Sequence, residues 1–122
     1  SKSVLEHFYF PEKILEEAYR IIKPQGLIIT MTPDWAYNII CFHEDFTHRT
    51  PFTLHSINEI HQISGFKNIQ SERFIQLPVV WNLPFLKVAT FFCRNFLPDI
   101  LKTYFKFVRF SKEIMLLTVA KK

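Results

Sequence analysis

The side chains best suited to acid–base chemistry gather in a polar loop, HEDFTHRTPFT, at residues 43–53. Imidazole titrates near neutral pH, so His48 could act as a general base towards a bound substrate. Asp45, three residues earlier, could tune the pKa of His48. The alternative is structural, because Asp45, Thr47 and His48 also suit a hydrogen-bonded turn that orders the loop.

The same loop contains residue types that bind metals. His43, Glu44, Asp45 and His48 all carry ligand atoms. Their spacing does not place the four side chains on one face of a helix. We therefore expect no metal site in this protein.

A second polar pair, Glu6 and His7, follows Val4 and Leu5 near the start of the chain. We interpret residues 1–7 as the end of a strand, with Val4 and Leu5 pointing inward and the polar pair at its carboxyl edge. Ligands of open α/β sheets bind beyond the carboxyl ends of the strands. Glu6 and His7 are thus expected to face a ligand, the alternative being that His7 only hydrogen-bonds the backbone.

The segment that must position these two groups predicts most of one βαβ unit. Pro11 suits the first position of a helix, and Pro24 and Gly26 end it. Apolar residues recur on one face of this helix at Ile14, Leu15, Ala18, Tyr19 and Ile22. Residues 27–31 follow as an apolar run typical of a strand covered on both faces, and Pro33 closes it.

Three motifs in this order resemble the second half of class I S-adenosylmethionine-dependent methyltransferases, in the branch that acts on small molecules. They are VLEH at residues 4–7, RIIKPQG at residues 20–26 and LIITMTP at residues 27–33. The loop sequence DFTHRTPFT at residues 45–53 also resembles this branch. Gln25 replaces the first glycine of the family's turn, so we expect its backbone to avoid a conformation that strongly needs glycine.

The resemblance implies an α/β, Rossmann-like methyltransferase sheet, of which this chain would be the C-terminal portion. It implies S-adenosyl-L-methionine as cofactor, flanked by Val4, Leu5, Glu6 and His7. It places Asp34, Trp35 and Asp45 against the acceptor substrate, with His48 as the catalytic base. The acceptor would be a small or lipid-like molecule.

Length and glycine content indicate part of one domain. The chain has 122 residues and only two glycines, Gly26 and Gly65, so the glycine-rich loop that normally holds the cofactor is not in it. We therefore expect residues 1–122 to be the C-terminal part of a single methyltransferase domain, inactive when alone. Two distant cysteines and no long apolar run favour a cytoplasmic protein.

The remaining elements follow from local signals. Thr53 is expected to cap a helix that runs through Ser64, with Gly65 in the left-handed conformation after it. His55 and His61 fall on different faces of that helix and are predicted to be surface residues. Residues 67–75 predict a strand near the sheet edge, and residues 113–120 a buried one. The resemblance implies that this last strand is antiparallel to its neighbours.

Residues 76–110 are expected to form a variable insertion, a loop followed by helices at residues 85–96 and 99–108. Net charge is uneven, at −2 for residues 1–75 and +6 for residues 76–122. The second helix carries Lys102, Lys106 and Arg109 on one face and apolar residues on the other. It could cover the sheet or the pocket, or lie on an anionic membrane. Nucleic-acid binding is not expected, because no recognisable module accompanies these residues.

Two functions remain open from the sequence. The first is methyl transfer from S-adenosylmethionine, catalysed largely by orientation and desolvation. The second is a non-catalytic Rossmann-like scaffold, associated with a membrane surface through the basic aromatic helix at residues 99–110. The oligomeric state is left open.

Overall fold

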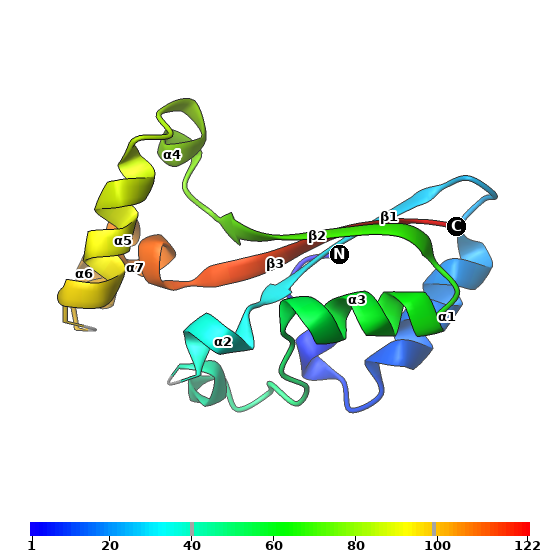
Figure 1. Ribbon diagram of the computed structural model, residues 1–122. Helices are drawn as coiled ribbons and strands as arrows, with labels where there is room; N and C mark the ends of the chain where they lie inside the picture. Colours follow the sequence, from blue (N-terminus) through cyan, green and yellow to red (C-terminus); the bar gives the residue numbers. More distant parts are fainter. Residues whose placement is uncertain (40, 99) are drawn as a thin grey trace.

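The computed structural model describes residues 1–39, 41–98 and 100–122. Its centre is a three-stranded sheet of β1 (Leu27–Pro33), β2 (Lys67–Ile75) and β3 (Ile114–Lys121) in the order β1-β3-β2 (Figure 1). β3 lies between the other two and is antiparallel to both. This confirms the expected antiparallel final strand. Parallel pairing among the described residues is limited to the isolated bridges Lys2–Met31 and Asp34–Phe52.

The first seven residues form less of a strand than the sequence predicts. Lys2 makes a single parallel bridge to Met31, and the chain then turns into the 3₁₀ helix η1 (Leu5–His7). Leu5 is buried as expected, but Val4 is 37% exposed and does not point inward. The prediction for Val4 was therefore wrong, because the chain leaves the strand path before the inward–outward alternation can continue.

α1 (Pro11–Ile21) begins at Pro11 as predicted and packs Leu15 into the core. Ile14 is 36% exposed and lies at the border of the buried face. Gln25, in the turn that follows, has a φ of +67°. It therefore adopts the left-handed conformation that we expected it to avoid. The turn before β1 places position 25 in the left-handed conformation. Glutamine is sterically strained in that conformation, whereas glycine is not.

α3 (Leu54–Ile63) is capped as predicted. The Thr53 side chain accepts from the Ser56 amide while Ser56 accepts from the Thr53 amide, a reciprocal capping box. Gly65 follows the helix with a φ of +94°. His55 is exposed, but the prediction of a surface position for His61 was wrong.

His61 is fully buried against the sheet. Its Nδ1 bonds the Ile57 carbonyl oxygen at 2.7 Å, and its Nε2 lies 3.1 Å from the Thr30 hydroxyl of β1. These two bonds satisfy both ring nitrogens, which is what makes burial of an imidazole tolerable. Burial lowers the pKa of His61, opposed by the bond to Ile57.

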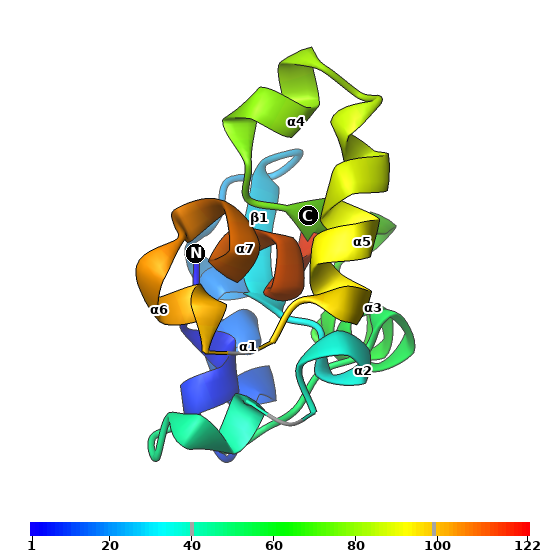
Figure 2. The same ribbon diagram turned by 90° about the vertical axis from the view of Figure 1, so that its left-hand side faces the viewer.

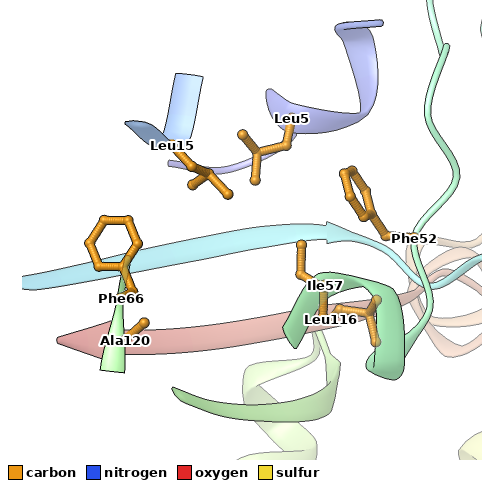
Figure 3. Packing of buried hydrophobic residues seen from close by; sticks show 7 residues of the cluster. All are labelled: Leu5, Leu15, Phe52, Ile57, Phe66, Leu116 and Ala120. Carbon is orange, nitrogen blue, oxygen red and sulfur yellow. The ribbon is translucent and has the colours of Figure 1, made fainter. Parts of the chain in front are cut away.

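The main core lies between the sheet and the layer formed by η1, α1 and α3 (Figure 3). Its buried members come from η1, α1, α3, β3 and the segments on either side of α3: Leu5, Leu15, Phe52, Ile57, Phe66, Leu116 and Ala120. Burial of aliphatic and aromatic side chains of this kind contributes about 1.5–3 kcal/mol each. Phe52, which precedes the Thr53 cap, and Ile57 of α3 are both in this cluster, the pair of positions that forms a hydrophobic staple across the start of a helix.

The opposite face of β1 is not covered as predicted. Leu27 is 59% exposed and Ile29 is 53% exposed. Figure 1 shows α1 and α3 on one side of the sheet, and no helix drawn there lies over β1 on the other side. The apolar sequence of β1 therefore predicts two-sided burial that the described residues do not supply.

Residues 76–112 form four helices at one end of the sheet (Figure 2). They are α4 (Pro78–Asn82), α5 (Leu86–Phe96), α6 (Leu101–Tyr104) and α7 (Lys106–Lys112). α5 matches the prediction, while α4 was expected to be loop. The single helix expected at residues 99–108 is two, because Phe105 has extended dihedrals; its predicted start, Asp99, lies outside the described residues. No described helix is both long and apolar enough to cross a membrane.

Candidate functional site

A cavity of about 660 Å³ opens beside the end of β1. Most of its lining comes from η1, the loop at residues 41–48 and the α6–α7 region. Glu6, His7, Asp45 and His48 all contribute to its wall, so the structure brings together two groups that the sequence separates by about forty residues. Lys102 and Arg109 line the other side, which agrees with the interpretation of the basic helices as a cover for the pocket.

The polar loop contains the hydrogen-bonded turn that the sequence suggests. The Asp45 carboxylate accepts from the Thr47 amide at 2.9 Å and from the Thr47 hydroxyl at 2.6 Å. These two bonds, the hydroxyl first, lower the pKa of Asp45. The structural alternative for the loop is thus confirmed, and it leaves His48 in the cavity wall.

The loop is fixed directly onto η1. The amides of Arg49 and Thr50 both donate to the Glu6 carbonyl oxygen, at 2.7 and 3.0 Å. The Thr50 hydroxyl donates to the carbonyl of Phe8 at 2.7 Å. These bonds explain how the backbone of the loop holds His48 beside residues 6 and 7.

His48 has a defined tautomer in its neutral form. Its Nδ1 lies 2.7 Å from the Phe42 carbonyl oxygen, which can only accept, so Nδ1 carries the proton. Phe42 belongs to the 3₁₀ helix η2 (Phe42–Glu44), and its ring also packs on the imidazole. The unprotonated Nε2 lies 3.8 Å from a carboxylate oxygen of Asp45. Asp45 is therefore as close to His48 as the sequence suggests.

His7 is oriented in the same way. Its Nδ1 lies 2.8 Å from the Thr47 hydroxyl, which already donates its own proton to Asp45. The His7 Nδ1 must therefore be the donor, and the neutral ring has its lone pair on Nε2. The rings of His7 and His48 have centroids 4.9 Å apart.

Glu6 is the unusual member of the group. It is completely buried, and neither of its carboxyl oxygens makes a hydrogen bond of normal geometry. Burial raises its pKa, opposed by its own backbone amide, the imidazoles of His7 and His48 and the Ser3 hydroxyl, in that order. Burying an ionisable carboxyl group is costly, and one whose pKa is shifted beside a cavity is a candidate functional residue.

The other predicted site residues lie away from this cavity wall. Asp34 is buried, caps α2 (Trp35–Asn38) through the Ala36 amide, and pairs with Arg73 at 2.7 Å. Trp35 packs edge-on against Phe42. Leu5 is in the core and Val4 faces outward. Contact of these four with cofactor or acceptor stays a prediction.

Some lining residues escaped the sequence analysis as site candidates. Phe42, Glu113 and Phe110 all line the cavity, as does Glu44, which the sequence analysis considered only as a metal ligand. Glu113 and Phe110 lie more than fifty positions beyond the polar loop, and no local sequence pattern predicts a contact between residues so far apart. For Phe42 the sequence holds one usable signal, because this aromatic residue directly precedes three polar ones, His43, Glu44 and Asp45.

No protein-family model matches this sequence, and no curated protein matches it. Solved structures do match. One is phosphoethanolamine N-methyltransferase 2 of Haemonchus contortus, in complex with phosphomonomethylethanolamine and S-adenosylhomocysteine, at 15% identity with a TM-score of 0.60. Another is a SAM-dependent methyltransferase from Archaeoglobus fulgidus, at 17% identity with a TM-score of 0.63.

The chain has a class I methyltransferase fold. It is covered over 100% of its length by the nematode enzyme and over 99% by the archaeal one. It spans only 32% and 57% of those two chains, respectively. The methyltransferase fold thus confirms the family resemblance seen in the sequence, at the level of architecture.

Proposed function

We propose that the whole protein transfers a methyl group from S-adenosylmethionine to a small or lipid-like acceptor, and that these residues supply the last strands of its domain. The observation that carries this proposal is the convergence of Glu6, His7, Asp45 and His48 on one cavity at the end of β1. Ligands of open α/β folds bind at that edge of the sheet. The cavity has room for a small molecule.

In this proposal the N-terminal segment, with Val4, Leu5, Glu6 and His7, lies on the cofactor side. Asp34, Trp35 and Asp45 lie on the acceptor side. His48 is the acceptor-side base, because its unprotonated Nε2 is the ring atom left available by the bond from Nδ1 to Phe42. Methyl transfer itself needs the two substrates aligned and water excluded, which a cover such as α6–α7 would help to achieve.

Cofactor binding is the first test. S-adenosylhomocysteine is titrated calorimetrically into this chain and into a version extended upstream of Ser1 into the rest of the coding sequence. We expect binding by the longer version and little by the shorter one, which lacks a glycine-rich loop. Absence of binding by both would overturn the proposed cofactor and favour the scaffold.

Catalysis by His48 is tested in the longer version with phosphomonomethylethanolamine, the molecule in the nematode enzyme complex, as the first of a panel of small acceptors. We expect His48→Ala to lower turnover by about 10²–10⁴-fold with little change in S-adenosylhomocysteine affinity. His55→Ala, an exposed histidine of α3, is the matched control. Unchanged turnover in His48→Ala would leave that residue with its structural role alone.

A second candidate function rests on the aromatic surface of the C-terminal helices. Phe85, Phe92 and Phe96 of the α5 region are 69%, 54% and 72% exposed. Tyr104 and Phe105 beside α6 are 73% and 57% exposed. Aromatic side chains next to basic ones suit the interface of an anionic membrane. We propose peripheral membrane contact here, either to reach a lipid-like acceptor or as the role of a non-catalytic scaffold.

A further inference from the structure

We propose that Glu6, His7 and His48 form a binding site for a divalent transition-metal ion. One carboxyl oxygen of Glu6 and one ring nitrogen from each histidine all lie within 4.8 Å of one another. Among the described residues, no other group of His, Cys, Asp and Glu side chains meets this criterion. The sequence analysis expected no metal because it considered only ligands within the polar loop.

The hydrogen bonds around the two imidazoles are those of metal ligands. His48 donates from Nδ1 to a backbone carbonyl, and His7 donates from Nδ1 to Thr47, which is in turn bonded to Asp45. Metal-bound histidines typically donate their other ring nitrogen to a carbonyl or a carboxylate network, which fixes the tautomer and leaves a basic nitrogen for the metal. Both rings therefore have an Nε2 lone pair to offer.

The state of Glu6 is an independent observation. Its carboxyl group is fully buried beside the two rings and makes no hydrogen bond of normal geometry. A bound cation would supply the missing interaction and would favour the ionised form of the carboxyl group. Without a cation, the cost of burying this carboxyl group is opposed by the Glu6 amide, the two imidazoles and the Ser3 hydroxyl.

The ligand set indicates the class of metal. Two imidazoles and one carboxylate bind Zn²⁺ in open catalytic sites and Fe²⁺ in the facial-triad sites, whereas Mg²⁺ and Ca²⁺ prefer oxygen alone. Ligand bonds of about 2.0–2.2 Å bring the donor atoms closer together than 4.8 Å. Binding therefore requires a small inward movement of the side chains. Three protein ligands leave further positions open towards the cavity.

This inference does not depend on methyl transfer. In the loaded site, the metal occupies the His48 lone pair that a general base would use, so the two roles of Nε2 exclude one another. The ion would then supply Lewis-acid chemistry, lowering the pKa of a bound hydroxyl or water.

The test is calorimetric titration of Zn²⁺ into the EDTA-treated, dialysed chain, without any cofactor. We expect a single saturable site, and at least a tenfold loss of affinity in both His48→Ala and Glu6→Gln. His55→Ala is the control and should bind like the wild type. Co²⁺ absorption gives a second readout, since nitrogen and oxygen ligands without thiolate produce no sulfur-to-cobalt charge-transfer band.

Far-UV circular dichroism shows whether the ligand variants fold. If they do not, Thr47→Val still tests the proposal. Thr47 is exposed, so this change removes the bond to His7 without disturbing the core. Loss of such a supporting bond typically weakens metal binding about 10–100-fold. Absence of saturable Zn²⁺ binding by the wild type, or equal affinity in the wild type, Thr47→Val and any folded ligand variant, would overturn the proposal.

Discussion

At the residue scale, two buried polar side chains, Asp34 and Asn38, connect the elements that lead to the polar loop. Asp34 ends β1, caps α2 and pairs with Arg73 of β2, so one carboxylate joins three elements. Asn38 adds two bonds from its side-chain amide, to the carbonyls of Asp34 and Ile114. These contacts position the start of the segment that leads to the polar loop.

Asp34→Ala is expected to lower the free energy of unfolding by about 1–3 kcal/mol, because it removes a helix cap and leaves Arg73 without its carboxylate. Urea unfolding of the chain measures this. Glu72→Ala, at the exposed neighbour of Arg73, is the control and should change stability by less than about 0.5 kcal/mol. A mutant as stable as the wild type would instead favour the predicted role of Asp34 in substrate binding.

His61 makes stability depend on pH. Its pKa is lowered in the folded chain, whereas in the unfolded chain it is about 6.5. Below that pH the unfolded state binds more protons, so the stability contribution present above pH 6.5 is lost as the pH falls. The expected slope is at most about 1.4 kcal/mol per pH unit.

Urea unfolding between pH 8 and pH 5 tests this, with His61→Gln as the comparison. The variant is expected to be less stable at pH 8 but to show a weaker fall towards pH 5. Parallel curves for the two proteins would contradict the assignment to His61.

At the element scale, the turn between α1 and β1 limits which residues its positions accept. α1 and β1 are joined by the turn at residues 22–26, where Gln25 has a positive φ and the Gly26 amide donates to the Lys23 carbonyl. A Cβ at Gly26 would lie 2.6 Å from the Ile22 side chain and 2.8 Å from the Lys23 oxygen. The turn thus tolerates a side chain at position 25 and excludes one at position 26.

Gln25→Gly is expected to raise the free energy of unfolding by about 0.5–1 kcal/mol. Removing the steric strain of the left-handed conformation stabilises the folded chain by about 1–2 kcal/mol. The greater conformational entropy of glycine in the unfolded chain offsets about half of this gain. Gly26→Ala is the opposite control and should destabilise because of the close contacts. Thermal unfolding of the three proteins measures both effects, and a lower melting temperature for Gln25→Gly would contradict the strain argument.

At the scale of the whole molecule, one face of β1 and the surface of the C-terminal helices leave apolar side chains exposed. Leu27 and Ile29 form part of the first surface, and Phe92 and Phe96 part of the second. Exposed apolar patches of this kind mark places where other protein or a membrane binds. In the matched methyltransferases, which are longer than this chain, the fold continues beyond the region it spans.

Liposome flotation tests the membrane proposal for the second surface. We expect the chain to float with vesicles containing anionic phosphatidylserine and to float less when Lys102, Lys106 and Arg109 are all changed to Glu. Phe92→Ser with Phe96→Ser should also weaken binding, because it removes apolar contact. The Glu12→Gln variant of α1, in the other helical layer, is the control. Equal flotation of the wild type and the triple variant would reject the proposal.

The sequence alone determined the elements whose signals are local. Pro11 fixes the start of α1, Thr53 and Ser56 fix the start of α3, and Gly65 fixes its end, since each acts through the backbone of its immediate neighbours. The β2 strand was predicted with its observed bounds. The antiparallel direction of β3 was expected from the family resemblance. The alternation of side chains in a sequence indicates a strand, but it does not show whether that strand runs parallel or antiparallel to its neighbours.

Only the tertiary structure decided the contacts between distant residues. It buried His61 by placing Thr30 opposite its ring, and it split the predicted helix at Phe105. It also brought Glu6 and His7 against His48, through two backbone bonds from residues 49 and 50 to the Glu6 carbonyl. Such contacts depend on how the chain closes over forty or more residues. The candidate metal ligands could therefore be named from the sequence one by one, but not as a group.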